Sequence, residues 1–131
     1  MLIGEASKQT GLSTKTIRFY CDRDLIAPRR DPFTGYRSFT EKDLAKLRFL
    51  KKARQLDFSI KDCSELLILY EQPDRSSLDV KIIASKKLKE LDAKANKLNS
   101  LRNQLKLLVE RCSGDHLPDC PILDALAGER N

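Results

Sequence analysis

The sequence predicts a mainly α-helical protein with a winged helix-turn-helix head, one long coiled-coil helix, and a C-terminal loop with a short helix. Three observations predict this fold class. Two short helix-forming segments joined by a glycine-containing turn open the chain. Residues 76–112 contain neither glycine nor proline. A short segment bounded by two cysteines, residues 112–120, follows directly.

The head is predicted to occupy residues 1–71. A helix over residues 3–11 ends at Gly11, because glycine adopts the left-handed conformation of a helix C-terminus at little cost. A second helix follows, capped by Ser13 or Thr14. Two short helices joined by such a turn form a helix-turn-helix, whose second helix fits the major groove of DNA.

Residues 27–39 interrupt the helical pattern. Their prolines and glycine mark turns, while Tyr36 and Phe39 suit short strands, so we expect a small two-stranded wing. Capping signals at Thr40 and Ser59 then begin a third and a fourth helix. The apolar positions of these two helices are Leu44, Leu47 and Leu50, then Cys63, Leu66, Leu67 and Tyr70.

Residues 76–112 carry a heptad pattern, with Arg102 as its one break. A lone helix has nothing against which to bury such a seam, and no second long helix follows it in the chain. The seam therefore predicts a homodimer, with residues 76–112 as its dimerisation helix. Its apolar positions are Ala84, Leu88, Leu91, Ala95, Leu98, Leu105, Val109 and Cys112.

Composition narrows the classes of function. The 131 residues carry a net charge of +6, which favours a polyanionic partner such as DNA. No secretory segment opens the chain and no apolar run approaches a membrane span, so we expect a cytoplasmic protein without a membrane partner. One histidine and no visible nucleophile–base arrangement argue against an enzyme.

Basic and hydroxyl side chains gather on the second predicted helix and on the wing. Arginine and lysine bind guanine edges or phosphates, and threonine and tyrosine hydroxyls bind the DNA backbone. An ordinary solvated helix also holds a few basic residues, but this one follows a helix-turn-helix turn and precedes a basic wing. The residues concerned are Lys15, Thr16, Arg18, Tyr20 and Arg23 of the helix, and Arg29, Arg30 and Arg37 of the wing.

The C-terminal segment, residues 112–131, is predicted to hold a metal-binding loop and a last short helix from Pro121. Thiolates select soft metals, and Cys112 and Cys120 can fold back onto a single ion. Cu(I), Ag(I) and Au(I) accept two sulfur ligands, whereas zinc usually takes four ligands. A divalent ion such as Zn(II), held by Cys112, His116 and Cys120, remains the alternative.

Three short motifs and the long helix resemble the MerR family of transcription activators. The motifs are residues 3–7 (Ile-Gly-Glu-Ala-Ser), residues 16–20 (Thr-Ile-Arg-Phe-Tyr) and residues 35–37 (Gly-Tyr-Arg). The cysteine loop resembles that of the family's copper-efflux regulators. The resemblance implies a homodimer whose long helices pair antiparallel and which holds double-stranded promoter DNA with and without inducer. Metal binding then distorts the DNA so that RNA polymerase engages both promoter elements.

The resemblance also implies roles for individual residues. Lys15, Arg18, Tyr20, Tyr36 and Arg37 match positions of the family's DNA-contacting head. Family members that sense divalent ions carry a cysteine at the start of the dimerisation helix, where this chain has Ser77. A serine oxygen is a poor ligand for soft metals, so Ser77 favours a monovalent ion. We therefore expect Cu(I), or Ag(I) or Au(I), as the inducer of copper-efflux or detoxification genes.

Overall fold

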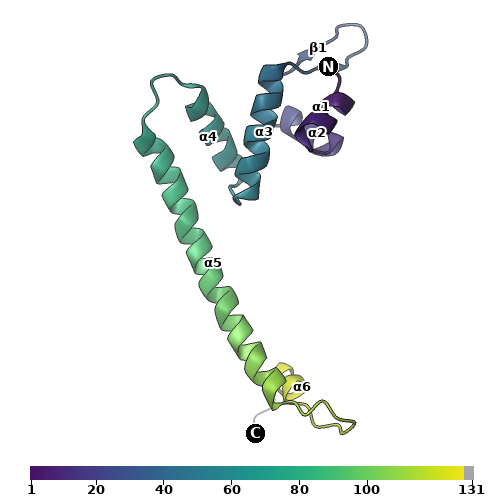
Figure 1. The fold of residues 1–131 in the computed structure, drawn as a ribbon, viewed down its shortest axis with the longest axis vertical. Helices are drawn as coiled ribbons and strands as arrows, with labels where there is room; N and C mark the ends of the chain where they lie inside the picture. The colour runs from purple at the N-terminus through teal and green to yellow at the C-terminus, as the bar shows by residue number, and fades with distance from the viewer. Residues whose placement is uncertain (129–131) are drawn as a thin grey trace. The chain divides into compact units, whose positions relative to one another are not determined.

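The structure is a computed structural model that describes residues 1–128, and it confirms the predicted mainly α-helical fold (Figure 1). Contacts divide the chain into two compact units, one over Met1–Lys87 and one from Leu88 onward. The elements in chain order are α1 (Ile3–Thr10), α2 (Thr14–Asp22), β1 (Arg29–Arg30), β2 (Arg37–Ser38), α3 (Glu41–Gln55), α4 (Ile60–Glu71), α5 (Ser77–Arg111) and α6 (Pro121–Leu126).

The helices of the head begin and end where their capping residues predict. Gly11 ends α1 in the left-handed region, with φ of 75°. The Ser13 side chain accepts a backbone hydrogen bond in the first turn of α2. Thr40 and Asp43 form a reciprocal capping box at the start of α3, and Ser59 caps α4. Local sequence therefore determines each of these helix boundaries.

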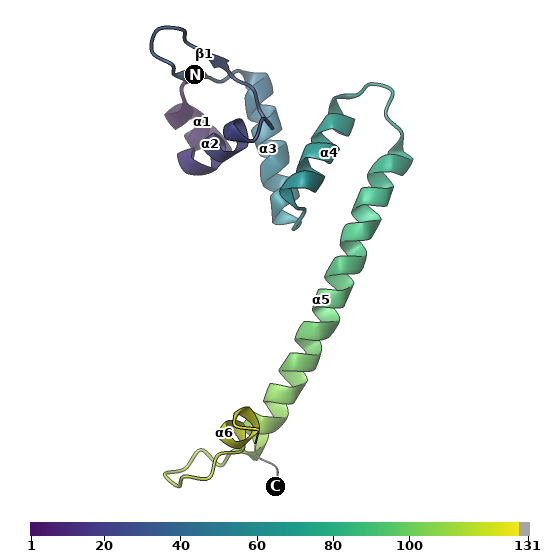
Figure 2. The same cartoon turned by 180° about the vertical axis from the view of Figure 1, so that it is seen from behind.

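The core of the head lies among α1, α2, α3 and α4. Helix α3 packs against both α1 and α4, and α3 and α4 lie side by side in the view from behind (Figure 2). Apolar side chains from these helices and from the segments that flank the wing meet there. The largest fully buried side chains are Phe39, Ile17, Ile26, Leu44, Leu47, Leu50 and Cys63.

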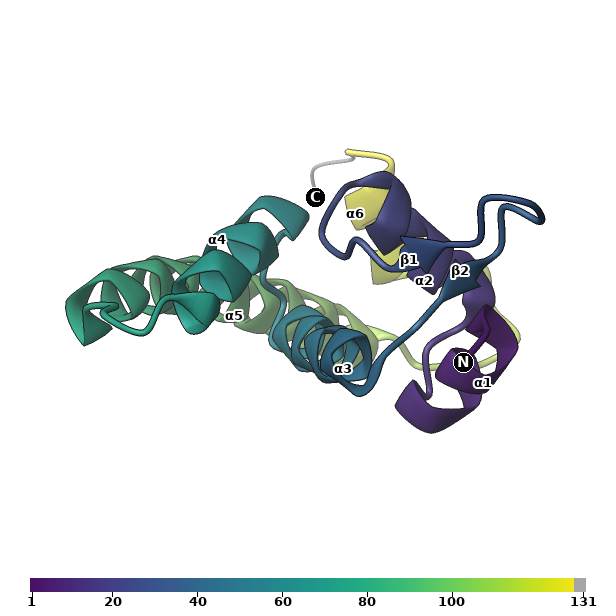
Figure 3. The same cartoon turned by 90° about the horizontal axis from the view of Figure 1, so that it is seen from above.

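The wing consists of two short antiparallel strands. Arg29 of β1 lies opposite Ser38 of β2, and the connecting loop extends beyond the strands (Figure 3). The prediction that Tyr36 and Phe39 form the strands is wrong. Tyr36 lies in the exposed loop before β2. Phe39 follows β2 and is buried because it belongs to the core of the head.

One further expectation about the head needs correction. Tyr70 is not a core residue of α4: it is 58% exposed in the last full turn, where it lies against Phe49 with ring centroids 5.1 Å apart. The compact unit that runs to Lys87 contains the predicted head of residues 1–71 together with the first turns of α5. Ile83, in the second turn of α5, packs against the core cluster. The first turns of α5 therefore stabilise the head as well as beginning the long helix.

Helix α5 is continuous from Ser77 to Arg111, as the absence of glycine and proline predicts. It is followed by a loop and by α6, which has proline at its first position. Residues 129–131 of the predicted C-terminal segment lie outside the described residues. No helix within residues 1–128 combines the length and the apolar character that crossing a bilayer requires.

Candidate DNA-binding surface and metal loop

Helix α2 separates a buried face from a basic face. Ile17 and Cys21, four residues apart, are buried in the core. Lys15 and Arg18, three residues apart, lie on the other side of the helix and are exposed. Because residues three and four apart share one face of a helix, the sequence itself orients the two cations away from the core. The second helix of the helix-turn-helix thus presents positive charge to solvent.

Thr16 has a local structural role at the start of α2. Its backbone N–H donates a hydrogen bond of 3.1 Å to Ser13 Oγ, and the Ser13 hydroxyl donates to Thr16 Oγ1 at 2.8 Å. The first bond satisfies one of the N–H groups that a helix N-terminus leaves without an intrahelical partner, and the second holds the capping hydroxyl in place. The half-buried Thr16 side chain therefore fixes the first turn that carries Lys15.

Tyr20 does not lie where a DNA contact is expected. Its side chain is 4% exposed, among the core residues of the head. Burial raises the pKa of the Tyr20 phenol, and the neighbouring Cys63 thiol raises it further. A ring with so little accessible surface has no area to offer to DNA. We therefore remove Tyr20 from the expected set of contacts and assign it to the core.

A groove on the head brings together three of the expected DNA-binding residues. The groove is lined by Arg18 of α2, Tyr36 of the wing loop and Arg37 of β2. Residues 2–5 at the start of α1 complete its lining. Tyr36 is 65% exposed, so its ring is available for contact. The wing thus lies beside α2 and joins its side chains to the basic face of that helix.

An ion pair connects the wing to α2. Arg37 Nη2 lies 3.0 Å from Asp22 Oδ1 at the end of α2. The Arg37 side chain is only 18% exposed, whereas that of Asp22 is 68% exposed. Because the Asp22 carboxylate remains in solvent, we expect the contribution of about 0–1 kcal/mol that is typical of surface pairs, so the pair fixes geometry more than it adds stability. No sequence motif indicated Asp22, although it lies four residues after Arg18 on the same face of α2.

The two loop cysteines lie at the ends of adjoining helices in the second unit. Cys112 directly follows α5, and its N–H donates to the carbonyl oxygens of Leu108 and Val109, both at 3.2 Å. Cys120 is the residue before α6, and its carbonyl oxygen accepts from the Asp124 N–H at 3.0 Å. Both thiols are free and half-buried. Helix ends thus fix the backbone on both sides of the loop.

The loop between the two thiols is exposed, and His116 is exposed within it. Among residues 1–128, no three histidine, cysteine, aspartate or glutamate side chains form a group able to hold a metal ion. Cys112 and Cys120 are the two half-buried thiols that border this loop. Two sulfur donors match the coordination that soft monovalent ions accept, and they fall short of the four ligands of a structural zinc site.

The other two cysteines differ from the loop pair in burial. Cys21 is 7% and Cys63 is 1% exposed, and both belong to the core of the head. Burial raises the pKa of both thiols, so neither is a ready thiolate at neutral pH. They behave as small apolar side chains, as their isolated positions in the sequence predict.

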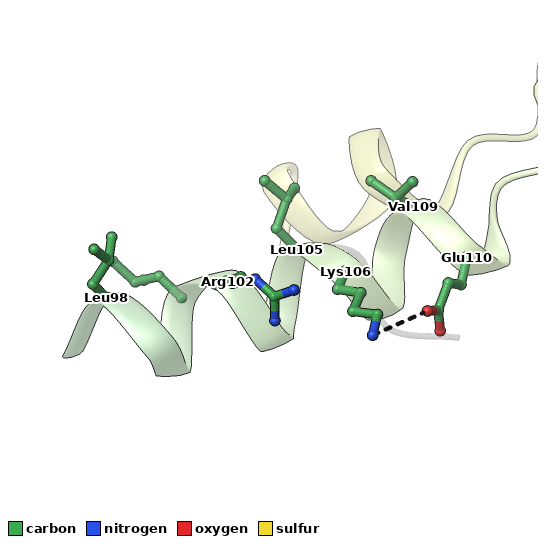
Figure 4. Close-up of a pocket in the computed structure, with 7 residues that line it drawn as sticks. Leu98, Arg102, Leu105, Lys106, Val109 and Glu110 are labelled. Atoms are coloured by element: carbon green, nitrogen blue, oxygen red, sulfur yellow. Dashed lines mark ion pairs between the residues drawn. The ribbon is translucent and has the colours of Figure 1, made fainter. Parts of the chain in front are cut away.

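Helix α5 carries an apolar face in the second unit. A shallow groove on this helix is lined by Leu98, Leu105 and Val109, which point to the same side (Figure 4). An ion pair flanks the groove, with Lys106 Nζ 3.9 Å from Glu110 Oε1. The three apolar side chains are 68%, 55% and 55% exposed. Their spacing is the predicted heptad seam, and nothing within the described part of the chain covers it.

Comparison with protein families decides the identity of this arrangement. The model for the MerR HTH family regulatory protein matches residues 1–68, which include the helix-turn-helix and the wing. A second model, MerR, DNA binding, matches residues 44–108 and so continues through most of α5. This chain belongs to the MerR family.

Individual MerR-family relatives match almost the whole chain. It is 50% identical over 127 residues to the transcriptional regulator HmrR of Rhizobium leguminosarum bv. viciae, covering 97% of this chain and 98% of that protein. It is 42% identical over 128 residues to the regulator CueR of Salmonella typhimurium, with 98% and 93% covered. Both relatives are described as helix-turn-helix transcriptional regulators.

The solved structure of another transcription regulator supports the fold. The transcription regulator PbrR691 from Ralstonia metallidurans, crystallised with lead(II), is similar to this chain with a TM-score of 0.81 and 25% identity. The similarity covers 96% of this chain and 98% of that one. As a MerR-family member, the chain is a DNA-binding regulator of transcription, and this family consists of regulators rather than enzymes.

Proposed function

We propose that this MerR-family chain is a Cu(I)-responsive transcriptional activator of copper-efflux and detoxification genes, with Ag(I) and Au(I) as further inducers. The observation that carries the proposal is the pair of free, half-buried thiols of Cys112 and Cys120 with no third donor grouped beside them among the described residues. The similarity to CueR over nearly the whole chain supports it.

The choice of a monovalent ion follows from ligand chemistry. Soft thiolates favour Cu(I), and two of them suffice for an ion that accepts linear coordination. A divalent ion needs more donors, and Ser77, the first residue of α5, offers only a hard hydroxyl oxygen. The Zn(II) alternative through Cys112, His116 and Cys120 finds no support in the exposed position of His116.

The regulator is proposed to act as a homodimer. The apolar face of α5, represented by Leu98, Leu105 and Val109, is exposed in the single chain and matches the heptad pattern of a coiled coil. Antiparallel pairing of two such helices would bury it. In this scheme residues 76–112 serve dimerisation, residues 1–71 bind promoter DNA, and residues 112–131 hold the inducer.

The head is proposed to hold double-stranded promoter DNA through exposed or groove-lining residues of α2 and the wing. Binding of the metal in the loop then changes the conformation of the DNA, so that RNA polymerase uses the promoter. Such a protein works in the cytoplasm, where thiols stay reduced. The residues proposed to contact DNA are Lys15, Thr16, Arg18, Tyr36 and Arg37.

Transcription in vitro tests this function. The full-length protein is combined with RNA polymerase and a template carrying a promoter that it binds, under anaerobic reducing conditions. We expect Cu(I) to raise transcript yield and Zn(II) at the same free concentration to leave it unchanged. His116→Ala serves as the control and is expected to respond as the natural chain does. A Zn(II) response that disappears in His116→Ala would instead establish the divalent alternative.

A further inference from the structure

Phe33 is the most exposed of the large apolar side chains in the described part of the protein. It lies in the wing loop between β1 and β2, and 96% of its surface is accessible. Leaving an aromatic side chain of this size in water forgoes about 1.5–3 kcal/mol of burial free energy. No packing within the head compensates for this position, since Phe33 belongs neither to the core cluster nor to the residues packed on it.

The backbone that presents Phe33 is held by hydrogen bonds. Asp31 Oδ1 accepts from the N–H groups of Phe33 at 2.8 Å and of Thr34 at 3.0 Å. The Asp31 N–H donates to the Tyr36 carbonyl oxygen at 2.8 Å, and Gly35 completes the turn with φ of 74°. The two bonds from Thr34 and Phe33 hold the pKa of the Asp31 carboxyl below its ordinary value. The loop is thus a defined turn that leaves the Phe33 ring in solvent, in the same loop as the exposed Tyr36.

The strands of the wing that carries this ring are basic. Arg29 and Arg30 of β1 are exposed, and Arg37 lies opposite Arg30 on β2. A protein partner that buries an apolar side chain normally meets a larger apolar patch, whereas this ring lies on a short wing that carries three arginines. A polyanion with an accessible apolar surface fits better. DNA has both features, since its phosphates border grooves that expose sugars and base edges.

The position of the wing indicates which groove Phe33 meets. Tyr36 and Arg37 of the wing share a groove on the head with Arg18 of α2. When α2 occupies the major groove, a wing beside it lies against the neighbouring stretch of DNA, where the minor groove comes next. Minor-groove binders often insert an apolar side chain at a base step and partially unstack it.

We propose that Phe33 contacts the minor groove beside the site of α2 and makes binding depend on how easily the base step beneath it opens. This inference rests on the proposed DNA-binding function of the head and adds a specificity determinant to it. Flexible pyrimidine–purine steps at that position favour binding, and stiff A-tracts disfavour it, because the protein deforms the step without forming hydrogen bonds to its bases.

Fluorescence anisotropy with the full-length protein and a promoter fragment tests the proposal across a series of salt concentrations. We expect Phe33→Ala to weaken binding about tenfold, similar to the effect of removing one good base-reading side chain. The slope of log K against log[salt] stays unchanged, because the phenyl ring neutralises no phosphate. Phe33→Leu retains most of the affinity.

The matched control is Arg30→Ala, also on the wing and also exposed. We expect Arg30 to neutralise one phosphate, so Arg30→Ala reduces the slope of log K against log[salt] by about one. Phe33→Ala leaves this slope unchanged. A 2-aminopurine placed at the step beneath the wing brightens on binding of the natural chain and stays dark with Phe33→Ala. Both variants keep the melting temperature of the natural chain, because neither side chain is buried.

Several outcomes would overturn the inference. Binding by Phe33→Ala within twofold of the natural chain removes Phe33 from the DNA interface. Unchanged binding together with reduced transcription assigns the ring to a protein partner instead. If the natural chain bound no promoter DNA at all, the proposed function would fail as well, so the two failures are distinguishable.

Discussion

Replacing either Cys112 or Cys120 with serine is expected to abolish Cu(I) binding in the physiological range and, with it, the transcriptional response. In a site with two ligands, such a change leaves a single soft donor and a hydroxyl oxygen that binds Cu(I) poorly. Removing a group that only hydrogen-bonds to a metal ligand lowers metal affinity by about 10–100-fold. Removing a ligand itself therefore lowers Cu(I) affinity by more than about 100-fold.

Competition with a Cu(I) chelator under reducing conditions measures this effect. His116→Ala, in the same exposed loop, is the matched control and keeps the affinity of the natural chain. All three variants keep metal-free DNA binding, because the head of residues 1–71 is unchanged. A serine variant that still competed as well as the natural chain would remove that cysteine from the site.

Leu105→Asp is expected to dissociate the dimer and to abolish tight promoter binding. Burying one leucine side chain contributes about 1.5–3 kcal/mol, and a symmetric seam contains each residue twice. The dimer dissociation constant therefore rises by at least about 100-fold, before the cost of burying a carboxylate is added. Sedimentation equilibrium measures the change, and circular dichroism checks that the head remains folded.

Leu107→Asp provides the control for this substitution. Leu107 is 52% exposed, close to the 55% of Leu105, but it does not line the apolar groove of α5. At about 100° per residue, a shift of two positions places it on a different side of the helix. We expect this variant to remain dimeric. Equal dissociation by both variants would show that the seam is not the dimer interface.

Features controlled by local sequence were predicted well. Gly11, Ser13, Thr40 and Ser59 set helix boundaries because their backbone or side chain satisfies groups within one turn. The long helix α5 followed from the absence of helix breakers. The sequence also predicts that Cys21 and Cys63 are buried, unlike the two loop cysteines. Each is a single cysteine with no second one at the spacing of a metal site, and such cysteines pack as small apolar residues.

The errors have two sources: one concerns a burial that local spacing already reveals, and the others concern contacts between distant residues. The residue type of Tyr20 predicts a contact with DNA, yet its spacing from Ile17 places both on the buried face of α2. Phe39 is fixed by the chain terminus: its N–H donates to the Met1 carbonyl oxygen at 2.7 Å, and the Met1 ammonium group donates back at 2.9 Å. No local pattern reveals such a pairing. The ion pair of Asp22 and Arg37 likewise joins residues that are distant in the sequence, so no local pattern predicts it.

The proposed function depends on two sulfur atoms of one loop capturing a soft monovalent ion. X-ray absorption at the copper edge of the Cu(I)-loaded, full-length protein tests this most directly, since it counts the ligand atoms around the metal. We expect two sulfur neighbours and no nitrogen or oxygen. Three or four ligands, or the scattering pattern of an imidazole ring contributed by His116, would contradict two-sulfur capture.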